Sequence, residues 1–362
     1  MKERRKRNMS RTGLLFMFCL LMLCGCAQIT GFMENTEVSG REVESLAAEK
    51  EDDTVLLGGM PVGIYMETDG VLVLDTEKMT GMDGKEYTPA QGVVSSGDYI
   101  TEVNHQKIEG KKQLMDLVEH LDGEKVLLTV RRENTILEKK LTPVQISKGN
   151  YRLGIWVRDN VQGLGTITFL TKNNKFAALG HGIHDIDTST LLTIKRGTLY
   201  RTSIQKVQKG SKGNPGTMEG IIVYNRFHQL GVIEKNTDAG IYGELNSDRS
   251  WIGEEVPIQV AKKEEIKTGE ARIRCYIDGE VKEYTICITQ IDKESDQVNK
   301  GMVIQVTDTE LLEKTGGIIQ GMSGSPIIQN GKLIGAVTHV FVQDSTKGYG
   351  IFIENMLKEE ES

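Results

Sequence analysis

Hydrophobic and polar residues alternate over short stretches along most of the chain, and turn residues separate these stretches. Examples are Gly70–Asp75, Gly165–Phe169 and Glu283–Thr289. A period of two is typical of strands with one buried face. The clearest helical spacing lies in Lys111–Leu121. Forty glycines against six prolines agree with many tight turns between short strands. The pattern therefore predicts a mainly β protein.

Length and charge exclude several classes of protein. With 362 residues, the chain is long enough for two or three domains and is no peptide hormone or toxin. Lys and Arg number 44 against 51 Asp and Glu, which gives a formal net charge of -7. The chain lacks the basic excess that holds a nucleic-acid backbone, so we expect no nucleic-acid partner.

The first 32 residues have the pattern of an export signal. Residues 2–11 contain six basic side chains and one acid, and the uncharged apolar run Gly13–Gly25 follows. These 13 residues are short for a bilayer span of about 20 residues. The next segment, Cys26–Phe32, has no charged residue, so it could extend the helix into a signal anchor. The basic end is expected to stay in the cytoplasm, so that the body of the chain is exported.

A lipoprotein signal is the alternative for the same segment. The sequence Leu-Cys-Gly-Cys that ends at Cys26 resembles a bacterial lipoprotein box, in which Cys26 would be lipidated and become the mature N-terminus. Both interpretations place a membrane attachment in residues 1–32. Residues 33–53 are rich in acids and lack a strong apolar period, so they are expected to form a linker.

Two cysteines, Cys275 and Cys287, lie outside the leader. They could bridge in an oxidising compartment, but they lie on the two arms of an apparent hairpin around Asp278-Gly279 and are not opposite each other. A disulfide needs its Cα atoms within about 7 Å, so this register disfavours the bridge. The chain is no disulfide scaffold.

Residues 54–145 have the spacing of a small β-rich domain. A glycine-rich loop precedes a strand, and the stretch Ser96–Asn104 (SGDYITEVN) comes later. These features resemble PDZ domains. The resemblance implies that backbone N–H groups of the loop cap a peptide carboxylate, while the peptide adds as a strand beside Gly63–Met66. The alternative is a plain hairpin connection. The loop residues are Gly59, Met60, Pro61, Val62, Gly63 and Ile64.

Residues 146–362 alternate short strands with turns, which favours a barrel or sandwich. The strongest chemical signal is the sequence GMSGSP, with Ser323 between glycines. It resembles the nucleophile loop of a chymotrypsin-like double barrel. The glycines let the N–H groups of Gly321 and Ser323 converge on a developing oxyanion. Because a serine hydroxyl is a weak nucleophile, Ser323 needs a neighbouring base.

His181 is the best-placed base among six histidines. It ends a predicted strand and precedes Ser323, as the histidine does in chymotrypsin-like enzymes. His339 follows the serine on an expected pocket strand. The alternatives for His181 are a turn residue or, with His184 and Asp185, a metal ligand. No helical spacing supports the metal, so we expect neither a metal nor another cofactor.

The GHGIHD sequence, the region of Asp308 and the GMSGSP sequence, following a PDZ-like unit and a leader, resemble the SpoIVB family of sporulation serine peptidases. The resemblance implies a catalytic set of His181, Asp308 and Ser323. Asp308 lies only 15 residues before the serine, unlike the acid of chymotrypsin-like enzymes. Three other acids could orient His181 instead: Asp185, Asp187 and Asp238.

The same resemblance implies a signalling endopeptidase. Such proteins cleave themselves near the N-terminus, leave the membrane for the space between the forespore membranes, and cleave a membrane regulator of an intramembrane protease that processes a sigma factor. The linker 33–53 is where self-cleavage is expected. Thr338–Gly350 is expected to set the substrate preference, which stays open. The alternatives are a non-catalytic PDZ scaffold and a general envelope quality-control protease, which carries its PDZ after the protease.

Overall fold

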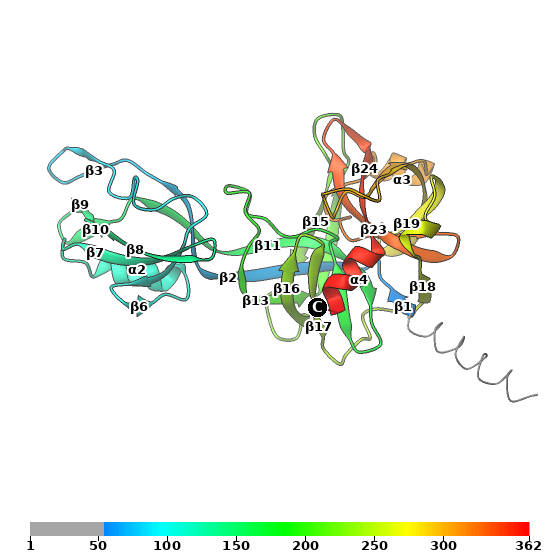
Figure 1. Ribbon diagram of the computed structural model, residues 1–362, viewed down its shortest axis with the longest axis horizontal. Helices are drawn as coiled ribbons and strands as arrows, with labels where there is room; N and C mark the ends of the chain where they lie inside the picture. The colour runs from blue at the N-terminus through cyan, green and yellow to red at the C-terminus, as the bar shows by residue number, and fades with distance from the viewer. Residues whose placement is uncertain (1–53, 362) are drawn as a thin grey trace, which may run out of the picture. The chain divides into compact units, whose positions relative to one another are not determined.

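The computed structural model describes residues 54–361, which are mainly β-strand. In this part of the chain, no helix is long and apolar enough to cross a bilayer. The predictions for the leader 1–32, for Cys26 and for the linker 33–53 lie outside the described residues. The strands and three α-helices belong to two barrels and one inserted unit (Figure 1).

Six antiparallel strands close the first barrel. Each pairs with the next, and the last pairs back onto the first. Buried Val62, Ile64, Phe176 and Ile241 fill its interior, because alternate residues of each strand point inward. In ring order the strands are β2 (Pro61–Thr76), β11 (Ile155–Leu170), β12 (Lys175–Ala178), β17 (Gly240–Leu245), β16 (Gln229–Thr237) and β13 (Ile194–Tyr200).

Six further antiparallel strands close the second barrel in the same way. Its interior includes Ile273, Ile286, Ile304 and Ile327. The two closed rings agree with the double barrel expected from the sequence. In ring order the strands are β19 (Gly269–Ile277), β20 (Glu280–Ile291), β21 (Met302–Val306), β24 (Asp344–Phe352), β23 (Lys332–Phe341) and β22 (Pro326–Gln329).

Shorter elements join and flank the barrels. β1 pairs with β11 of the first barrel and with β18, and β18 pairs in parallel with β23 of the second. The helix α4 contacts both β12 and β23. These elements are β1 (Thr54–Leu57), β14 (Thr202–Gln208), β15 (Thr217–Ile222), β18 (Pro257–Val260), the 3-10 helix η1 (Lys263–Glu265), α3 (Thr309–Thr315) and α4 (Ile353–Glu361).

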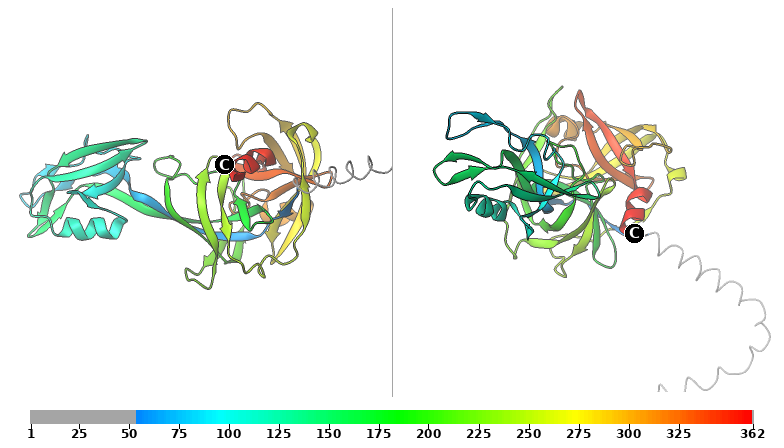
Figure 2. Two further views of the ribbon diagram at one scale, coloured as in Figure 1. Left: turned by 60° about the horizontal axis from the view of Figure 1, so that its bottom comes forward. Right: turned by 60° about the vertical axis from the view of Figure 1, so that its left-hand side comes forward.

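The PDZ-like unit is an insertion into the first barrel. The second half of β2 and the first residues of β11 leave the barrel and pair with each other, and β2 also pairs with β5 (Figure 1; left view of Figure 2). The unit has its own core, which includes Val71, Ile100, Leu128 and Leu153. Its other elements are β3 (Met79–Thr80), β4 (Glu86–Tyr87), β5 (Tyr99–Val103), β6 (Gln106–Lys107), α2 (Lys111–Glu119), β7 (Val126–Arg132), β8 (Thr135–Leu141), β9 (Val144–Ser147) and β10 (Asn150–Arg152).

This insertion changes the expected boundary between a PDZ domain at 54–145 and a peptidase domain at 146–362. Residues 54–68 pair with strands of the barrels, whereas the core of the inserted unit extends to Val157. The sequence concealed the boundary because β2 continues as one strand of 16 residues from the barrel into the insert. The same holds for the 16 residues of β11.

The glycine loop Gly59–Ile64 therefore does not bind a peptide carboxylate, and that prediction is wrong. The N–H group of Gly59 donates to the carbonyl oxygen of Ile167, and Met60 accepts from the N–H group of Ile167. Pro61, Val62, Gly63 and Ile64 pair with β11 inside the barrel. Val62 and Ile64 are buried in its core, so this segment has no open edge for a ligand.

Cys275 and Cys287 are both free thiols. Cys275 lies opposite Lys282 and Cys287 lies opposite Glu270, which is the offset register that the hairpin pattern indicated. Burial raises the pKa of the Cys275 thiol to about 12, so this thiol stays protonated at neutral pH.

Candidate active site

A cleft of about 360 Å³ lies where the two barrels meet. His181 enters it from the first barrel, and Ser323 and His339 enter it from the second. The structure thus brings together the two residues that the sequence proposed as base and nucleophile, although they are far apart along the chain.

The first barrel holds the serine loop through two threonines of β11. The N–H group of Thr166 donates to the carbonyl oxygen of Ser323 at 2.9 Å, and the Thr166 hydroxyl donates to that of Gly321 at 2.8 Å. The Thr168 hydroxyl donates to the carbonyl oxygen of Gly324 at 2.8 Å. A side chain at Gly324 would collide with the carbonyl oxygen of Thr166, which explains the glycine there.

The serine loop also contains two backbone donors. Among the hydrogen bonds of residues 54–361, none uses the N–H group of Gly321 or of Ser323. Gly321 has a φ of +103°, a conformation that favours glycine. The two N–H groups are therefore not used within the fold, and their convergence on an oxyanion stays a prediction.

The Ser323 hydroxyl donates to the carbonyl oxygen of Thr338 at 2.8 Å. It makes no hydrogen bond to His181 in this structure, although both line the same cleft. Rotation about one side-chain bond of Ser323 is needed to break the bond to Thr338. Catalytic hydrogen bonds are often incomplete until substrate binds.

His181 is held in the tautomer that a general base requires. Its Nδ1 lies 2.8 Å from the carbonyl oxygen of Gly182, which can only accept, so Nδ1 carries the proton and Nε2 is free to accept another. Burial lowers the pKa of His181 below its ordinary value, and the bond to Gly182 opposes this shift in part. The imidazole is therefore neutral at neutral pH.

A second imidazole packs on the first. The ring centroids of His181 and His339 are 4.7 Å apart, with an interplanar angle of 35°. Desolvation, with a smaller contribution from His181, lowers the pKa of His339 to about 4. The cleft thus contains two neutral imidazoles. The sequence placed His339 on a pocket strand but indicated no contact with His181.

Asp308 is not brought to His181. One carboxylate oxygen of Asp308 accepts from the N–H group of Leu311 at 3.1 Å and caps α3, and the other accepts from that of Thr285 at 3.2 Å. Within the described part of the chain, no carboxylate forms a hydrogen bond or ion pair with His181. The structure therefore gives Asp308 a capping position, and the carbonyl group of Gly182 stands where a triad would have its acid.

The three alternative acids are also occupied elsewhere. Asp185 is buried and forms an ion pair with Arg158, and Asp187 bonds to the same guanidinium at 2.9 Å. Asp238 lies 3.5 Å from Nε2 of His184. Over residues 54–361, no group of three or more His, Cys, Asp or Glu side chains is arranged to hold a metal ion.

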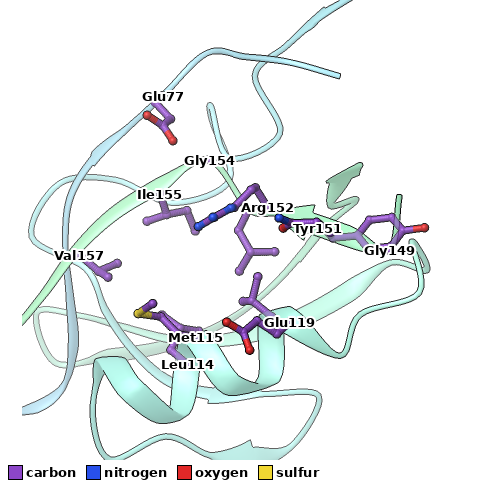
Figure 3. A pocket seen from close by; sticks show the side chains of 13 residues that line it. Glu77, Leu114, Met115, Glu119, Gly149, Tyr151, Arg152, Gly154, Ile155 and Val157 are labelled. Carbon is purple, nitrogen blue, oxygen red and sulfur yellow. The ribbon is translucent and has the colours of Figure 1, made fainter. Parts of the chain in front are cut away.

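A second hollow, of about 390 Å³, lies in the inserted unit between α2 and the segment that leads into β11 (Figure 3). Apolar side chains of the helix face apolar side chains of the strand across it. The helix contributes Leu114, Met115 and Val118, and the opposite side contributes Leu153, Ile155 and Val157.

The segment Arg152–Ile155 has the features of a carboxylate-binding loop that were expected at Gly59–Ile64. The N–H groups of Leu153 and Gly154 donate to no acceptor among the described residues, and Gly154 has a φ of +68°. The carbonyl oxygen of Gly154 accepts from the N–H group of Glu77, which fixes the turn. The sequence signal that could have located it is Leu153-Gly154-Ile155 directly before a strand.

Three solved structures illustrate the similarity of this chain to known structures, each with a low TM-score. The PDZ domain of the SdrC-like protein Lmo2051 from Listeria monocytogenes is 24% identical, with a TM-score of 0.20; the match covers 25% of this chain and 87% of that one. The active form of the Rv3671c protease from M. tuberculosis is 14% identical, with a TM-score of 0.30, over 55% and 72% of the two chains. The HtrA-type protease AlgW with a tripeptide is 12% identical, with a TM-score of 0.33, over 54% of each.

Sequence comparisons give a curated relative and a family. A protein of Helicobacter pylori (strain J99), named as a zinc metalloprotease, is 28% identical over 180 residues, which are 43% of this chain and 50% of the relative. The chain thus spans about half the length of that relative. The model of the SpoIVB peptidase S55 family matches residues 149–357, more than half of the chain, including His181 and Ser323. The chain therefore belongs to the SpoIVB peptidase S55 family.

Proposed function

We propose that this protein is a membrane-tethered serine endopeptidase that cleaves itself and then a membrane protein, as a signal between compartments during endospore formation. One observation carries the endopeptidase part: a neutral His181 and Ser323 share a cleft with two unused backbone donors. The signalling part is supported by the family. The proposed substrate is a regulator of an intramembrane protease.

The proposed reaction is acyl transfer through Ser323. The hydroxyl turns from Thr338 to Nε2 of His181, which takes its proton as Oγ bonds to the carbonyl carbon. The N–H groups of Gly321 and Ser323 stabilise the oxyanion. His181 then gives the proton to the amine nitrogen as the C–N bond breaks. In the second half of the reaction, His181 takes a proton from water as the water oxygen bonds to the acyl carbon. His181 then gives this proton to Oγ of Ser323 as the ester bond breaks, which restores Ser323.

The carbonyl group of Gly182 has the orienting role in this proposal. It accepts from Nδ1 of His181 in the resting state, and it accepts the same proton when the ring is positively charged. A carbonyl dipole stabilises an imidazolium less than a carboxylate does. We therefore propose a His181–Ser323 pair as the catalytic core, with Asp308 outside the reacting atoms.

Peptide capture by the inserted unit completes the proposal. A peptide C-terminus would place its carboxylate on the N–H groups of Leu153 and Gly154, with Arg152 beside it, and add as a strand along Ile155–Val157. Its terminal side chain would contact the apolar hollow of Figure 3. The partner is thus a peptide or protein tail with a free, apolar C-terminus.

Membrane attachment and release rest on the N-terminal sequence. A signal anchor or a lipid on Cys26 would hold the exported body at the membrane, and cleavage in residues 33–53 would free it into the space between the forespore membranes. The insertion of the PDZ-like unit within the first barrel differs from quality-control proteases, in which it follows the protease. The paired His181 and Ser323 speak against a non-catalytic scaffold.

The test compares the full-length protein with Ser323→Ala and Ser325→Ala. Ser325 is a matched control, because it lies in the same loop, is buried, and has a hydroxyl group with no hydrogen-bond partner among the described residues. We expect intact mass and N-terminal sequencing to show trimming within about residues 27–55 for the parent and Ser325→Ala alone. If the Ser323→Ala variant is trimmed as well, the protein does not cleave itself through Ser323. In the source organism, loss of heat-resistant spores with Ser323→Ala would support the signalling role.

A further inference from the structure

Among residues 54–361, no Asp, Glu, Lys or Arg side chain lines the cleft beside Ser323. Its walls come from both barrels and are mostly aliphatic. From the first barrel come Leu164 and Leu179, and from the second come Ile318, Ile319 and Val340. The titratable side chains that line it are His181 and His339, and the pKa of each is lowered, so both are neutral at neutral pH.

Ile318 limits the depth of the cleft. It lies five residues before Ser323 and is 2% exposed. A Cβ atom placed on Gly348 of β24 would lie 2.6 Å from Cδ1 of Ile318, so the isoleucine fills the space over this glycine. The preceding residue, Gly317, is buried against the backbone of Ser345 and contributes no side chain. The floor is therefore apolar and closed.

Substrate geometry places one side chain in this space. With the carbonyl oxygen at the N–H groups of Gly321 and Ser323, we take the side chain of the residue that carries this carbonyl to enter the cleft, whose lining includes Ile318 and Val340. A charged side chain there would lose its hydration without gaining a counter-charge, which is strongly unfavourable. An aliphatic side chain gains free energy from the same burial.

We infer that Ser323 cleaves peptide bonds on the carboxyl side of an uncharged aliphatic residue of moderate size, such as Val, Leu or Met, and rejects Lys, Arg, Asp and Glu. This inference rests on the serine peptidase activity and adds its substrate class. The aliphatic walls determine the chemistry of the accepted side chain, and Ile318 determines its length. Aromatic residues fit less well because the floor is closed.

Val340 is the position at which this specificity can be altered. It lies on β23, opposite Gly348 in the β23–β24 pairing, and is half-buried at the cleft wall. A carboxylate at this position would lie at the cleft wall and supply the missing counter-charge for a basic substrate residue. Val342 is a matched control, because it follows the same strand, is 54% exposed and does not line the cleft.

The test uses the full-length protein in detergent with peptides that differ only at the residue before one bond. We expect kcat/KM for Leu, Val or Met to exceed that for Lys, Arg, Asp or Glu by at least about 100-fold. Val340→Asp should raise the Lys-to-Leu ratio of kcat/KM by at least about tenfold, and Val342→Asp should leave it unchanged. Val340→Thr should lower the activity on Leu without creating activity on Lys.

Two outcomes would overturn the inference: efficient cleavage after charged residues by the parent, or an unchanged preference in a folded Val340→Asp. A serine-directed fluorophosphonate separates these from failure of the peptidase activity itself. If it labels the parent and not Ser323→Ala while cleavage shows no aliphatic preference, only the inferred specificity fails. If it labels neither protein, the nucleophile assignment fails as well.

Discussion

The imidazole rings of His181 and His339 lie 4.7 Å apart, inclined by 35°. No carboxylate among the described residues bonds to His181, so its orientation depends on the Gly182 carbonyl group and on this ring contact. Both imidazoles are neutral at neutral pH because their pKa values are lowered. His181 can therefore gain a proton during catalysis without a charged neighbour at His339.

Replacing His339 tests this positioning role. A ring contact of this kind contributes roughly 1 kcal/mol, so His339→Ala should lower kcat by about fivefold with little change in KM. His339→Phe retains a ring and should recover most of kcat. Steady-state kinetics on one peptide substrate measure both. Equal loss of kcat in the Ala and Phe variants would instead indicate a role for the imidazole nitrogens.

The pH dependence of kcat/KM reports the protonation of His181. The base acts in its neutral form, so activity should rise with pH through the pKa of His181. Burial and the neighbouring His184 lower this pKa, which places the midpoint below the ordinary value of 6.5. His184→Ala should move the midpoint upward. A midpoint at or above 7 in the parent would contradict a partly buried, neutral base.

Local sequence signals pointed to two residues that the fold brings to one cleft, and their catalytic roles stay predictions. Gly324 lies against the carbonyl oxygen of Thr166, and Gly321 has a φ of +103°, so both positions favour glycine, which is visible in the sequence itself. The place of His181 after a strand is visible in the same way. The alternation of polar and apolar residues also predicted the strands and the barrels, because it depends on which face of each strand is buried.

Contacts between residues far apart in the sequence were harder to predict from the sequence. The sequence does not reveal that β2 changes partners from β13 to β5 along its length, since both parts alternate in the same way. For this reason the sequence pattern predicts a ligand loop at Gly59–Ile64 and not at Arg152–Ile155. The contact of His339 with His181 and the capping by Asp308 likewise depend on three-dimensional neighbours.

Substitutions at Asp308 distinguish a cap from a catalytic acid. If Asp308 caps α3 as in the structure, Asp308→Ala should lower the free energy of unfolding by about 0.5–2 kcal/mol, and Asp308→Asn by less. Activity of both folded variants should stay within a few-fold of the parent. A catalytic acid would show the opposite, since loss of its charge lowers kcat by about 10⁴-fold in a triad. Thermal unfolding and kinetics on the same preparations decide between the two.

The loop that follows His181 depends on the ion pair between Asp185 and Arg158. Asp185 is buried, and its second carboxylate oxygen accepts from the N–H groups of Asp187 and Thr188 at 3.0 Å each. Asp185→Asn should therefore lower the free energy of unfolding by about 2–4 kcal/mol. Asp187→Asn removes an acid that is 49% exposed and bonded to the same arginine, and should cost less than about 1 kcal/mol. If both variants lose a similar free energy of unfolding, the burial of Asp185 does not determine how much its ion pair stabilises the loop.

Peptide binding at Arg152–Ile155 can be measured apart from cleavage by using full-length Ser323→Ala. A fluorescent peptide with a free C-terminal Val or Leu should bind, and amidation of its C-terminus should weaken binding by at least about tenfold, because hydrogen bonds to a charged group are lost. Arg152→Ala should weaken it by about threefold, since Arg152 is exposed and its charge is screened.

Lys112→Ala is the control for this measurement, since Lys112 is exposed on α2 and does not line the hollow. It should leave the affinity unchanged. Met115→Glu places a charge on the apolar helix face of the groove and should abolish binding of the free peptide. Equal affinity for the free and amidated peptides would show that the unused N–H groups of Leu153 and Gly154 do not hold a carboxylate, whatever the fate of the catalytic site.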